Sequence, residues 1–246
     1  MAKTLTWYEA VESIKSHVVR ISTPRGTGTG FLLYMGAKSS ICVIATAAHV
    51  IDHAHYWEDN IRLEHAGSGK STIIRYDQRA VFIDENKRDT AAIVIQKGLL
   101  PFPENVLPLI DKGKHLKQGN DIGWVGYPAV APANLCFFGG RVSAWSEQEK
   151  DTYLVDGVAI NGVSGGPAFY IKKAKKEAAV IIGVMSAYIP NRVTGETLPG
   201  LTVIRGVAQF HELAPTFKSF DQAKEQETEP SAVLPLDTKS DSKKQD

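Results

Sequence analysis

Short apolar runs separated by Gly, Pro and Asn make up most of the chain, and one amphipathic segment precedes them. Apolar residues at positions 7, 10, 11 and 14 share one face of a predicted helix over residues 6–17, which starts with the capping-box pattern of Thr6 and Glu9. Runs rich in β-branched and aromatic residues follow, with turn signals between them. They cover residues 18–22, 30–34, 41–46, 61–64, 72–76, 80–83, 91–96, 122–127, 135–142, 152–155, 167–171, 179–186 and 201–204. This pattern predicts an all-β fold of the barrel or sandwich type.

A proline-rich segment at residues 101–108 divides the predicted strands into two sets of similar size. This favours two barrels over one sheet. We expect an N-terminal helix within residues 1–17, a first β-barrel over 18–105 and a second over 106–215. Residues 221–246 hold seven acids and four bases with few large apolar side chains. Such a segment buries too little surface to offset the entropy of ordering it, so we expect a disordered tail over 216–246.

The charge balance and the lengths of the apolar runs exclude several classes of protein. The 246 residues hold 28 Lys and Arg against 27 Asp and Glu, so the basic excess of a nucleic-acid binder is missing. No apolar run reaches the roughly 18 residues of a membrane span, and the N-terminus lacks a secretory-signal pattern. Cys42 and Cys136 fit buried thiols in a reducing compartment. We therefore expect a cytoplasmic protein without nucleic-acid or membrane partners.

Two glycine-rich stretches and a group of histidines resemble ligand motifs, but their surroundings argue against each. Residues 26–30 lack the third glycine of a dinucleotide fingerprint, and Glu64 stands where a phosphate loop ending at residues 67–72 needs its first glycine. A predicted strand, not a helix, follows both stretches. His49 and His53 would share a helix face, but no cysteine cluster completes a zinc site. We expect no metal and no cofactor, with His53 and His55 as exposed turn residues.

The sequence NGVSGGP at residues 161–167 is typical of a tight turn that exposes a nucleophilic serine, Ser164. Glycines on both sides permit such a turn and leave N–H groups free to bind an oxyanion. The elbow of α/β-hydrolases has the same pattern, but an acid and then a histidine follow its serine. Here no Asp lies between Ser164 and the downstream His211, whereas His49 and Asp89 precede the serine. Singly, His49 fits a core histidine and Asp89 a helix cap; the ordered set of three favours a catalytic triad.

In this order the motifs resemble those of chymotrypsin-fold serine proteases, nearest to bacterial trypsin-like peptidases of the HtrA type without their PDZ module. The resemblance covers about residues 18–189. It rests on GTGF at 28–31, TAAHV at 46–50, DTA at 89–91, GYP at 126–128, GVSGGP at 162–167 and GVMSA at 183–187. It implies two six-stranded antiparallel Greek-key β-barrels with the active site between them. His49 and Asp89 would lie on the first barrel and Ser164 on the second.

The resemblance also implies a role for each site residue. Ser164 would be the nucleophile, His49 the general base and Asp89 the acid that orients the imidazole. The backbone N–H groups of Gly162 and Ser164 would form the oxyanion hole, and Ser186 would place its hydroxyl against Asp89. The implied activity is that of a serine endopeptidase, which cleaves polypeptide substrates through an acyl-enzyme intermediate.

Three departures from the family pattern bear on activation and specificity. Val163 replaces the acid that captures a new N-terminus in the digestive enzymes, so we expect no activation by N-terminal trimming. Val158 stands at the pocket floor, where no carboxylate favours Lys or Arg. Tyr188, two residues after Ser186, stands at the pocket mouth, where a ring would narrow the entrance. We expect a small or medium apolar residue, such as Ala, Val or Leu, before the scissile bond.

Two other functions are compatible with the same residues. A fold alone does not carry a function, so a non-catalytic or switch-activated peptide-binding module on a trypsin-like fold is the alternative. An esterase using the same triad is the third hypothesis, because acyl-transfer machinery accepts esters. The sequence leaves the oligomeric state open.

Overall fold

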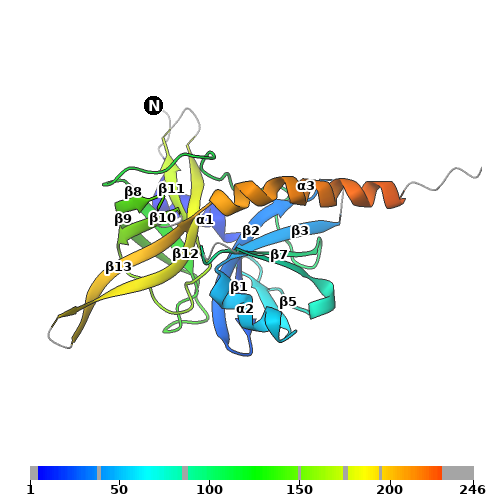
Figure 1. Ribbon diagram of the computed structural model, residues 1–246, viewed down its shortest axis with the longest axis horizontal. Helices are drawn as coiled ribbons and strands as arrows, with labels where there is room; N and C mark the ends of the chain where they lie inside the picture. Colours follow the sequence, from blue (N-terminus) through cyan, green and yellow to red (C-terminus); the bar gives the residue numbers. More distant parts are fainter. Residues whose placement is uncertain are drawn as a thin grey trace, which may run out of the picture.

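Thirteen β-strands form two sheets, with a helix before them and a longer helix after them (Figure 1). The computed structural model describes residues 5–37, 40–84, 88–148, 151–173, 177–193 and 196–228. The first sheet comprises the strands before residue 97 and the second those after residue 120. The predicted all-β, two-part architecture is confirmed.

The predicted N-terminal helix is present as α1 (Trp7–Lys15). Its capping box forms as expected: the Thr6 hydroxyl accepts from the Glu9 N–H, and the Glu9 carboxylate accepts from the Thr6 N–H. Trp7 packs against Phe137 and Phe169, with ring centroids 5.6 and 5.7 Å apart. The helix therefore covers part of the second sheet, although it precedes the first in the chain.

The first sheet is antiparallel throughout, with the strand order β5-β4-β1-β2-β3-β7-β6. It also carries α2 (Ala48–Tyr56) after β3 and the short 3-10 helix η1 (Tyr76–Gln78) after β5. The strands are β1 (Val18–Thr23), β2 (Gly26–Met35), β3 (Ile41–Thr46), β4 (Ile61–His65), β5 (Ser71–Ile74), β6 (Ala80–Ile83) and β7 (Ala91–Gln96).

The expected closed six-stranded first barrel is instead a seven-stranded sheet, and no ladder joins its edges among the described residues. The edge strands β5 and β6 are consecutive in sequence, so η1 joins them and the sheet curls round on itself. Arg79 bridges the gap between the edges. Its guanidinium donates to the carbonyls of Ile74, Ala54 and Asp59 at 3.0, 2.8 and 2.7 Å.

The second sheet is a closed six-stranded barrel, as expected, with the order β10-β13-β12-β11-β8-β9. Beyond the barrel, β12 and β13 continue as a long two-stranded arm (Figure 1). The strands are β8 (Asp121–Gly126), β9 (Cys136–Ser146), β10 (Thr152–Asp156), β11 (Pro167–Lys172), β12 (Ala178–Val193) and β13 (Glu196–Gly206).

The predicted start of a disordered tail at residue 216 is wrong. The last barrel strand ends at Gly206, and α3 (Ala208–Thr228) follows and lies across the first sheet (Figure 1). Phe210 and Phe217, two turns apart on α3, are 2% and 1% exposed. Sequence analysis missed this helix because its apolar face is sparse and Pro215 interrupts its pattern. The remainder of the predicted tail, residues 229–246, lies outside the described residues.

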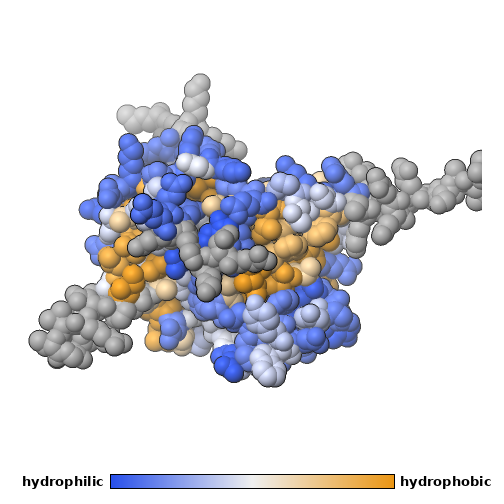
Figure 2. Space-filling model, in the orientation of Figure 1, coloured by the Kyte–Doolittle hydropathy of each residue, from blue (hydrophilic) through white to orange (hydrophobic). Residues whose placement is uncertain are grey.

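The core consists of two clusters of buried apolar side chains. One fills the second barrel and continues under α1 and α3, and the other fills the first sheet beneath α2. Figure 2 shows a band of hydrophobic residues below α3, over β3 and β7. None of the described helices is long and apolar enough to cross a membrane.

Candidate active site

The pairing of β3 with β7 brings His49 and Asp89 together. Thr46, the last residue of β3, lies opposite Ala91, the first residue of β7, so the residues just beyond these strand ends are neighbours. The His49 Nδ1 lies 2.8 Å from Asp89 Oδ2 and 3.0 Å from Oδ1. The His49 N–H also donates to Oδ1 at 3.0 Å, and the Ala48 N–H donates to the Asp89 carbonyl at 3.2 Å. Four contacts thus fix the carboxylate relative to the imidazole.

Asp89 is charged and His49 readily protonated in this arrangement. Burial opposes the charge on Asp89, but hydrogen bonds from His49 and Ser186 outweigh it and lower the pKa of the carboxyl group. The hydrogen bond to Asp89 raises the pKa of His49, against a smaller opposing effect of burial, and the charge of Asp52 adds to the increase. The predicted contact of Ser186 is present, since its hydroxyl donates to Asp89 Oδ2 at 2.5 Å.

Ser164 lies in a tight turn between two glycines with left-handed backbone, Gly162 at φ +91° and Gly165 at φ +86°. The Asn161 carbonyl accepts from the Ala129 N–H at 2.6 Å, and the Val163 carbonyl accepts from the Gly166 N–H at 3.0 Å. In a trans peptide the N–H points opposite to the C=O. The N–H groups of Gly162 and Ser164 therefore point away from these partners.

Neither of these two N–H groups donates to any described residue. They are the groups that the resemblance assigns to the oxyanion hole. Their peptide planes are held through the carbonyls, and donors held in place stabilise a developing anion better than mobile ones.

Thr29, on β2, is a residue that sequence analysis did not single out. It is fully buried and joins the first sheet to the serine turn. Its N–H donates to the Ser164 carbonyl at 2.8 Å and its hydroxyl to the Gly162 carbonyl at 2.9 Å. The hydroxyl also accepts from the Tyr127 N–H at 3.1 Å. The sequence offers two equivalent candidates, Thr27 and Thr29, each between two glycines, so local pattern could not single out Thr29.

The Ser164 hydroxyl donates to the Ser186 carbonyl at 3.4 Å. No hydrogen bond among the described residues joins it to His49. Ser186 thus connects the two parts of the site, with its hydroxyl on Asp89 and its carbonyl on Ser164.

The predicted pocket residues are only partly brought together. Val158 is 56% exposed in the segment after β10, so it does not form the floor of an enclosed pocket as expected. Ser186 is buried beside Asp89. The backbone of Tyr188 pairs with Thr202 on β13, while its side chain lies outside the described part of the structure.

One edge of β12 is open beside the serine. The ladder between β11 and β12 ends at Val184, and Met185 bonds to Gly165 and Gly166 in the serine turn. From Ser186 onward, β12 pairs only with β13 among the described strands. An extended chain could add to this edge, since an unpaired strand edge presents N–H and C=O groups.

The histidines after His49 do not form an exposed turn. His53 and His55 lie within α2 and are half-buried, and His53 Nδ1 is 3.4 Å from Asp59. Among the described residues, no three His, Cys, Asp or Glu side chains are grouped as a metal site would require.

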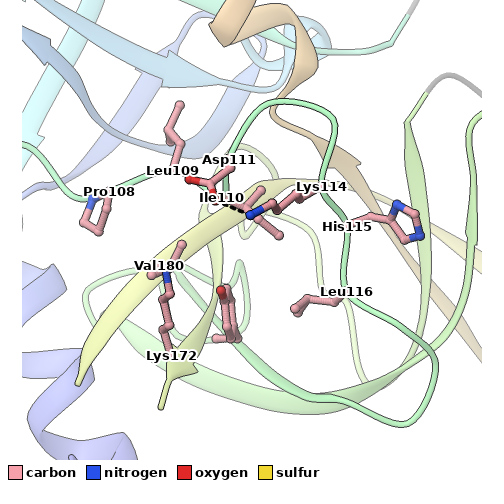
Figure 3. A pocket seen from close by; sticks show the side chains of 10 residues that line it. Pro108, Leu109, Ile110, Asp111, Lys114, His115, Leu116, Lys172 and Val180 are labelled. Carbon is pink, nitrogen blue, oxygen red and sulfur yellow. Dashed lines mark hydrogen bonds and ion pairs between the residues drawn. The ribbon is translucent and has the colours of Figure 1, made fainter. Parts of the chain in front are cut away.

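A separate hollow of about 270 Å³ lies between the 108–116 segment and the strands β11 and β12 (Figure 3). Across it, the Lys114 ammonium donates to the Asp111 carboxylate at 2.9 Å, and both side chains are exposed. No residue of the site described above lines this hollow.

Three solved structures are similar to this one at low sequence identity. The serine endoprotease from Yersinia pestis matches with a TM-score of 0.63 at 18% identity, over 87% of this chain and 67% of that chain. Deg5 matches with a TM-score of 0.60 at 17% identity, over 88% and 98%. The inactive mutant form of Rv3671c from Mycobacterium tuberculosis H37Rv has a TM-score of 0.55 at 17% identity, over 94% and 100%. At this level of identity the similarities show a shared fold and nothing further.

At the level of sequence, no curated protein matches the chain. The family described as the trypsin-like peptidase domain matches residues 28–174, which contain His49, Asp89 and Ser164. This match spans more than half of the 246 residues. The chain therefore belongs to the trypsin-like peptidase domain family and is a serine protease.

Proposed function

We propose that this protein is an endopeptidase that cleaves polypeptides through an acyl-enzyme on Ser164, with His49 as the base and Asp89 as the orienting acid. One observation carries the proposal. The N–H groups of Gly162 and Ser164 point away from the hydrogen bonds that hold the carbonyls of the same two peptides. The same molecule holds His49 and Asp89 in a hydrogen-bonded pair. The combination supplies a nucleophile, a base and two oxyanion donors.

The reaction follows from these positions. As Ser164 Oγ bonds to the substrate carbonyl carbon, His49 Nε2 takes the hydroxyl proton. The carbonyl oxygen becomes an oxyanion that accepts from the N–H groups of Gly162 and Ser164; one such donor is typically worth about 10²–10³-fold in rate. The C–N bond then breaks while His49 returns the proton to the leaving amine. Water, deprotonated by His49, releases the acyl group by the same steps.

The substrate proposed is an extended polypeptide with a small or medium apolar residue before the scissile bond. The open edge of β12 from Ser186 onward supports strand-like binding, because a peptide backbone pairs there without requiring particular side chains. The segment 158–160 reads Val-Ala-Ile and carries no charge that would favour Lys or Arg. The exposure of Val158 supports a shallow pocket and therefore a modest preference.

A second candidate function has one observation in its favour. The Ser164 hydroxyl is bonded to the Ser186 carbonyl rather than to His49, as expected of a peptide-binding module whose triad assembles only on a signal. The N–H groups of Gly162 and Ser164, which have no acceptor among the described residues, support the constitutive protease instead.

The test is intact-mass analysis after treatment with a fluorophosphonate probe. We expect one adduct on the native chain, none on Ser164→Ala, and one on the matched control Ser219→Ala, whose serine is exposed on α3 and remote from the site. A folded native chain without an adduct would contradict the constitutive protease and favour the switch-activated module.

Specificity is tested with peptides that differ only in the residue before the scissile bond. We expect Ala, Val and Leu to give higher kcat/KM than Lys, Arg or Asp. Matched esters assayed in parallel separate the esterase hypothesis: hydrolysis of esters alone would overturn the endopeptidase.

A further inference from the structure

The helix α3 comes from the end of the second barrel and contacts the segment of the first sheet that carries Asp89 (Figure 1). Two of its side chains reach the residues on either side of this aspartate. Glu212 binds Arg88, and Gln209 binds Thr90. Asp89 therefore lies between two residues that a helix from the other half of the molecule holds.

On one side, Arg88 is held by two carboxylates. Its Nε and Nη2 donate to Asp84 at 2.6 and 3.2 Å, and its backbone N–H donates to the same carboxylate at 2.9 Å. Nη1 and Nη2 donate to the two oxygens of Glu212 at 3.2 and 2.7 Å, a bidentate pair. Only 11% of the Arg88 side chain is exposed, so water competes weakly for these bonds.

The charge state of Glu212 suits this role. Its hydrogen bonds with Arg88 lower the pKa of its carboxyl group, against a smaller opposing effect of burial. The other charged groups that act on it are Asp84, which raises this pKa, and Lys112, which lowers it. Glu212 therefore remains ionised, and the pair with Arg88 persists, throughout the neutral range.

On the other side, Thr90 is fully buried and Gln209 is 5% exposed. The Gln209 amide is hydrogen-bonded to the Thr90 hydroxyl. In the amide orientation that satisfies both of its polar atoms, the Gln209 nitrogen also donates to the Thr90 carbonyl at 3.3 Å. Its oxygen accepts from the Asp84 N–H at 3.1 Å. One buried amide thus holds backbone groups of both Asp84 and Thr90.

Between these anchors, Asp89 has a backbone φ of +54°. This left-handed region is unfavourable for a residue with a Cβ atom, although Asp tolerates it better than most. Such a conformation persists where the surroundings over-determine it. In it, the carboxylate faces His49 and the carbonyl accepts from the Ala48 N–H.

We propose that α3 positions the catalytic acid: Gln209 and Glu212, by holding Thr90 and Arg88, keep Asp89 in the backbone conformation that orients His49. This inference rests on the proposed role of Asp89. Gln209 and Glu212 act through its neighbours and are positioning residues. Their role goes beyond attaching the helix to the sheet, because the two residues that they hold flank Asp89 in the chain.

The far part of α3 provides a control for docking alone. Asp221 accepts from the Ala37 N–H at 3.1 Å and from the Tyr34 hydroxyl at 3.4 Å, and Phe217 packs against Tyr34. These contacts attach the same helix to the same sheet about three turns away from Gln209. Asp221→Asn therefore weakens the docking of α3 without touching the residues beside Asp89.

The experiment compares Gln209→Leu, Glu212→Gln and their double variant with Asp221→Asn in the full chain. The pKa of His49 is measured by NMR titration, and kcat and KM are measured on one peptide. We expect the double variant to lose about 10–100-fold in kcat with KM nearly unchanged, since small misplacements of catalytic groups cost this much. The pKa of His49 should fall, because Asp89 raises it more than Asp52 does. Asp221→Asn should leave kcat within about twofold even where it lowers Tm.

Native values of kcat and of the His49 pKa in the double variant would overturn the inference, as would an equal loss in Asp221→Asn. Because Glu212 is 53% exposed, Glu212→Gln should fold even if Gln209→Leu does not, and alone it should lower both quantities. The titration needs no activity, so it tests the positioning even if Ser164→Ala proves fully active and the proposed function fails.

Discussion

The two halves of the proposed active site are held by different means. On the first sheet, Asp89 and His49 are arranged by side-chain hydrogen bonds, with further support from α3. On the second barrel, the turn around Ser164 is arranged mainly by backbone hydrogen bonds to the carbonyls of Asn161, Val163 and Ser164, with the Thr29 hydroxyl as the one side-chain donor identified above. The acid–base half therefore depends on which side chains surround it, and the serine half depends on the backbone path.

The architecture of the two sheets explains this difference. In the closed barrel every strand has two hydrogen-bonded neighbours, so the loops between strands start from a rigid frame. The seven-stranded sheet has two edges without a joining ladder, and elements from outside it, such as α3, complete its support. At Gly165 any side chain would collide with the Thr29 carbonyl, so the serine turn also excludes most substitutions.

The largest effect should come from the serine half. Ser164→Ala removes the nucleophile and should lower kcat by about 10⁴–10⁶-fold. Among the described residues the hydroxyl makes a single hydrogen bond, to the Ser186 carbonyl, so the variant should fold normally. Steady-state kinetics and thermal unfolding measure the two quantities. An active, folded variant would remove this mechanism.

On the acid–base half, Asp89→Asn should lower kcat by about 10⁴-fold, because the amide favours the wrong imidazole tautomer. It should also lose the charge that raises the pKa of His49. Kinetics with NMR titration of His49 test both statements. Asp52→Asn is the matched control, since it removes a charge near His49 without a hydrogen bond to the ring. If the two variants behaved alike, the role of Asp89 would be purely electrostatic.

Thr29 tests whether the two halves are coupled. Thr29→Val keeps the shape but leaves the Tyr127 N–H and the Gly162 carbonyl without their partner. A buried unpaired group costs about 1–3 kcal/mol in the free energy of unfolding. We expect a drop in kcat of about 10–100-fold, less than the loss of an oxyanion donor itself. Thr29→Ser retains the hydroxyl, so its kcat and stability should remain near those of the native protein. A Thr29→Val variant with native kcat would show that the two halves of the site are not coupled through Thr29.

The smallest effect concerns pH. The pKa of His49 is raised above its ordinary value of 6.5 by Asp89. Because the base must be neutral, kcat/KM should fall about tenfold per pH unit below this raised pKa. The stability of the fold depends on pH in the opposite direction. The stabilisation that His49 contributes is fully present below pH 6.5 and is lost as the pH rises through the raised pKa. A pH–rate profile with its midpoint below 6.5 would contradict the assignment.

Local pattern predicted much of the fold. The strands Ile41–Thr46, Ala80–Ile83 and Ala91–Gln96 have the bounds expected from the sequence, because β-branched runs between turn residues carry their own limits. The capping box of Thr6 and Glu9 marked the start of the first helix, because this signal too lies within a few neighbouring residues. The order of His49, Asp89 and Ser164 was also visible, since motif and spacing lie in the chain itself.

Contacts between distant segments decided the rest. Whether a set of strands closes depends on how its first and last members meet, so the missing ladder between the edges of the first sheet was not predictable from its seven runs. The helix α3 is sparse in apolar residues, and the first sheet supplies the surface that it covers. Thr29 and Gln209 became significant only through partners more than 90 residues away. The sequence alone determined the chemical groups of the site; tertiary structure decided what holds them, because packing joins residues that local pattern cannot relate.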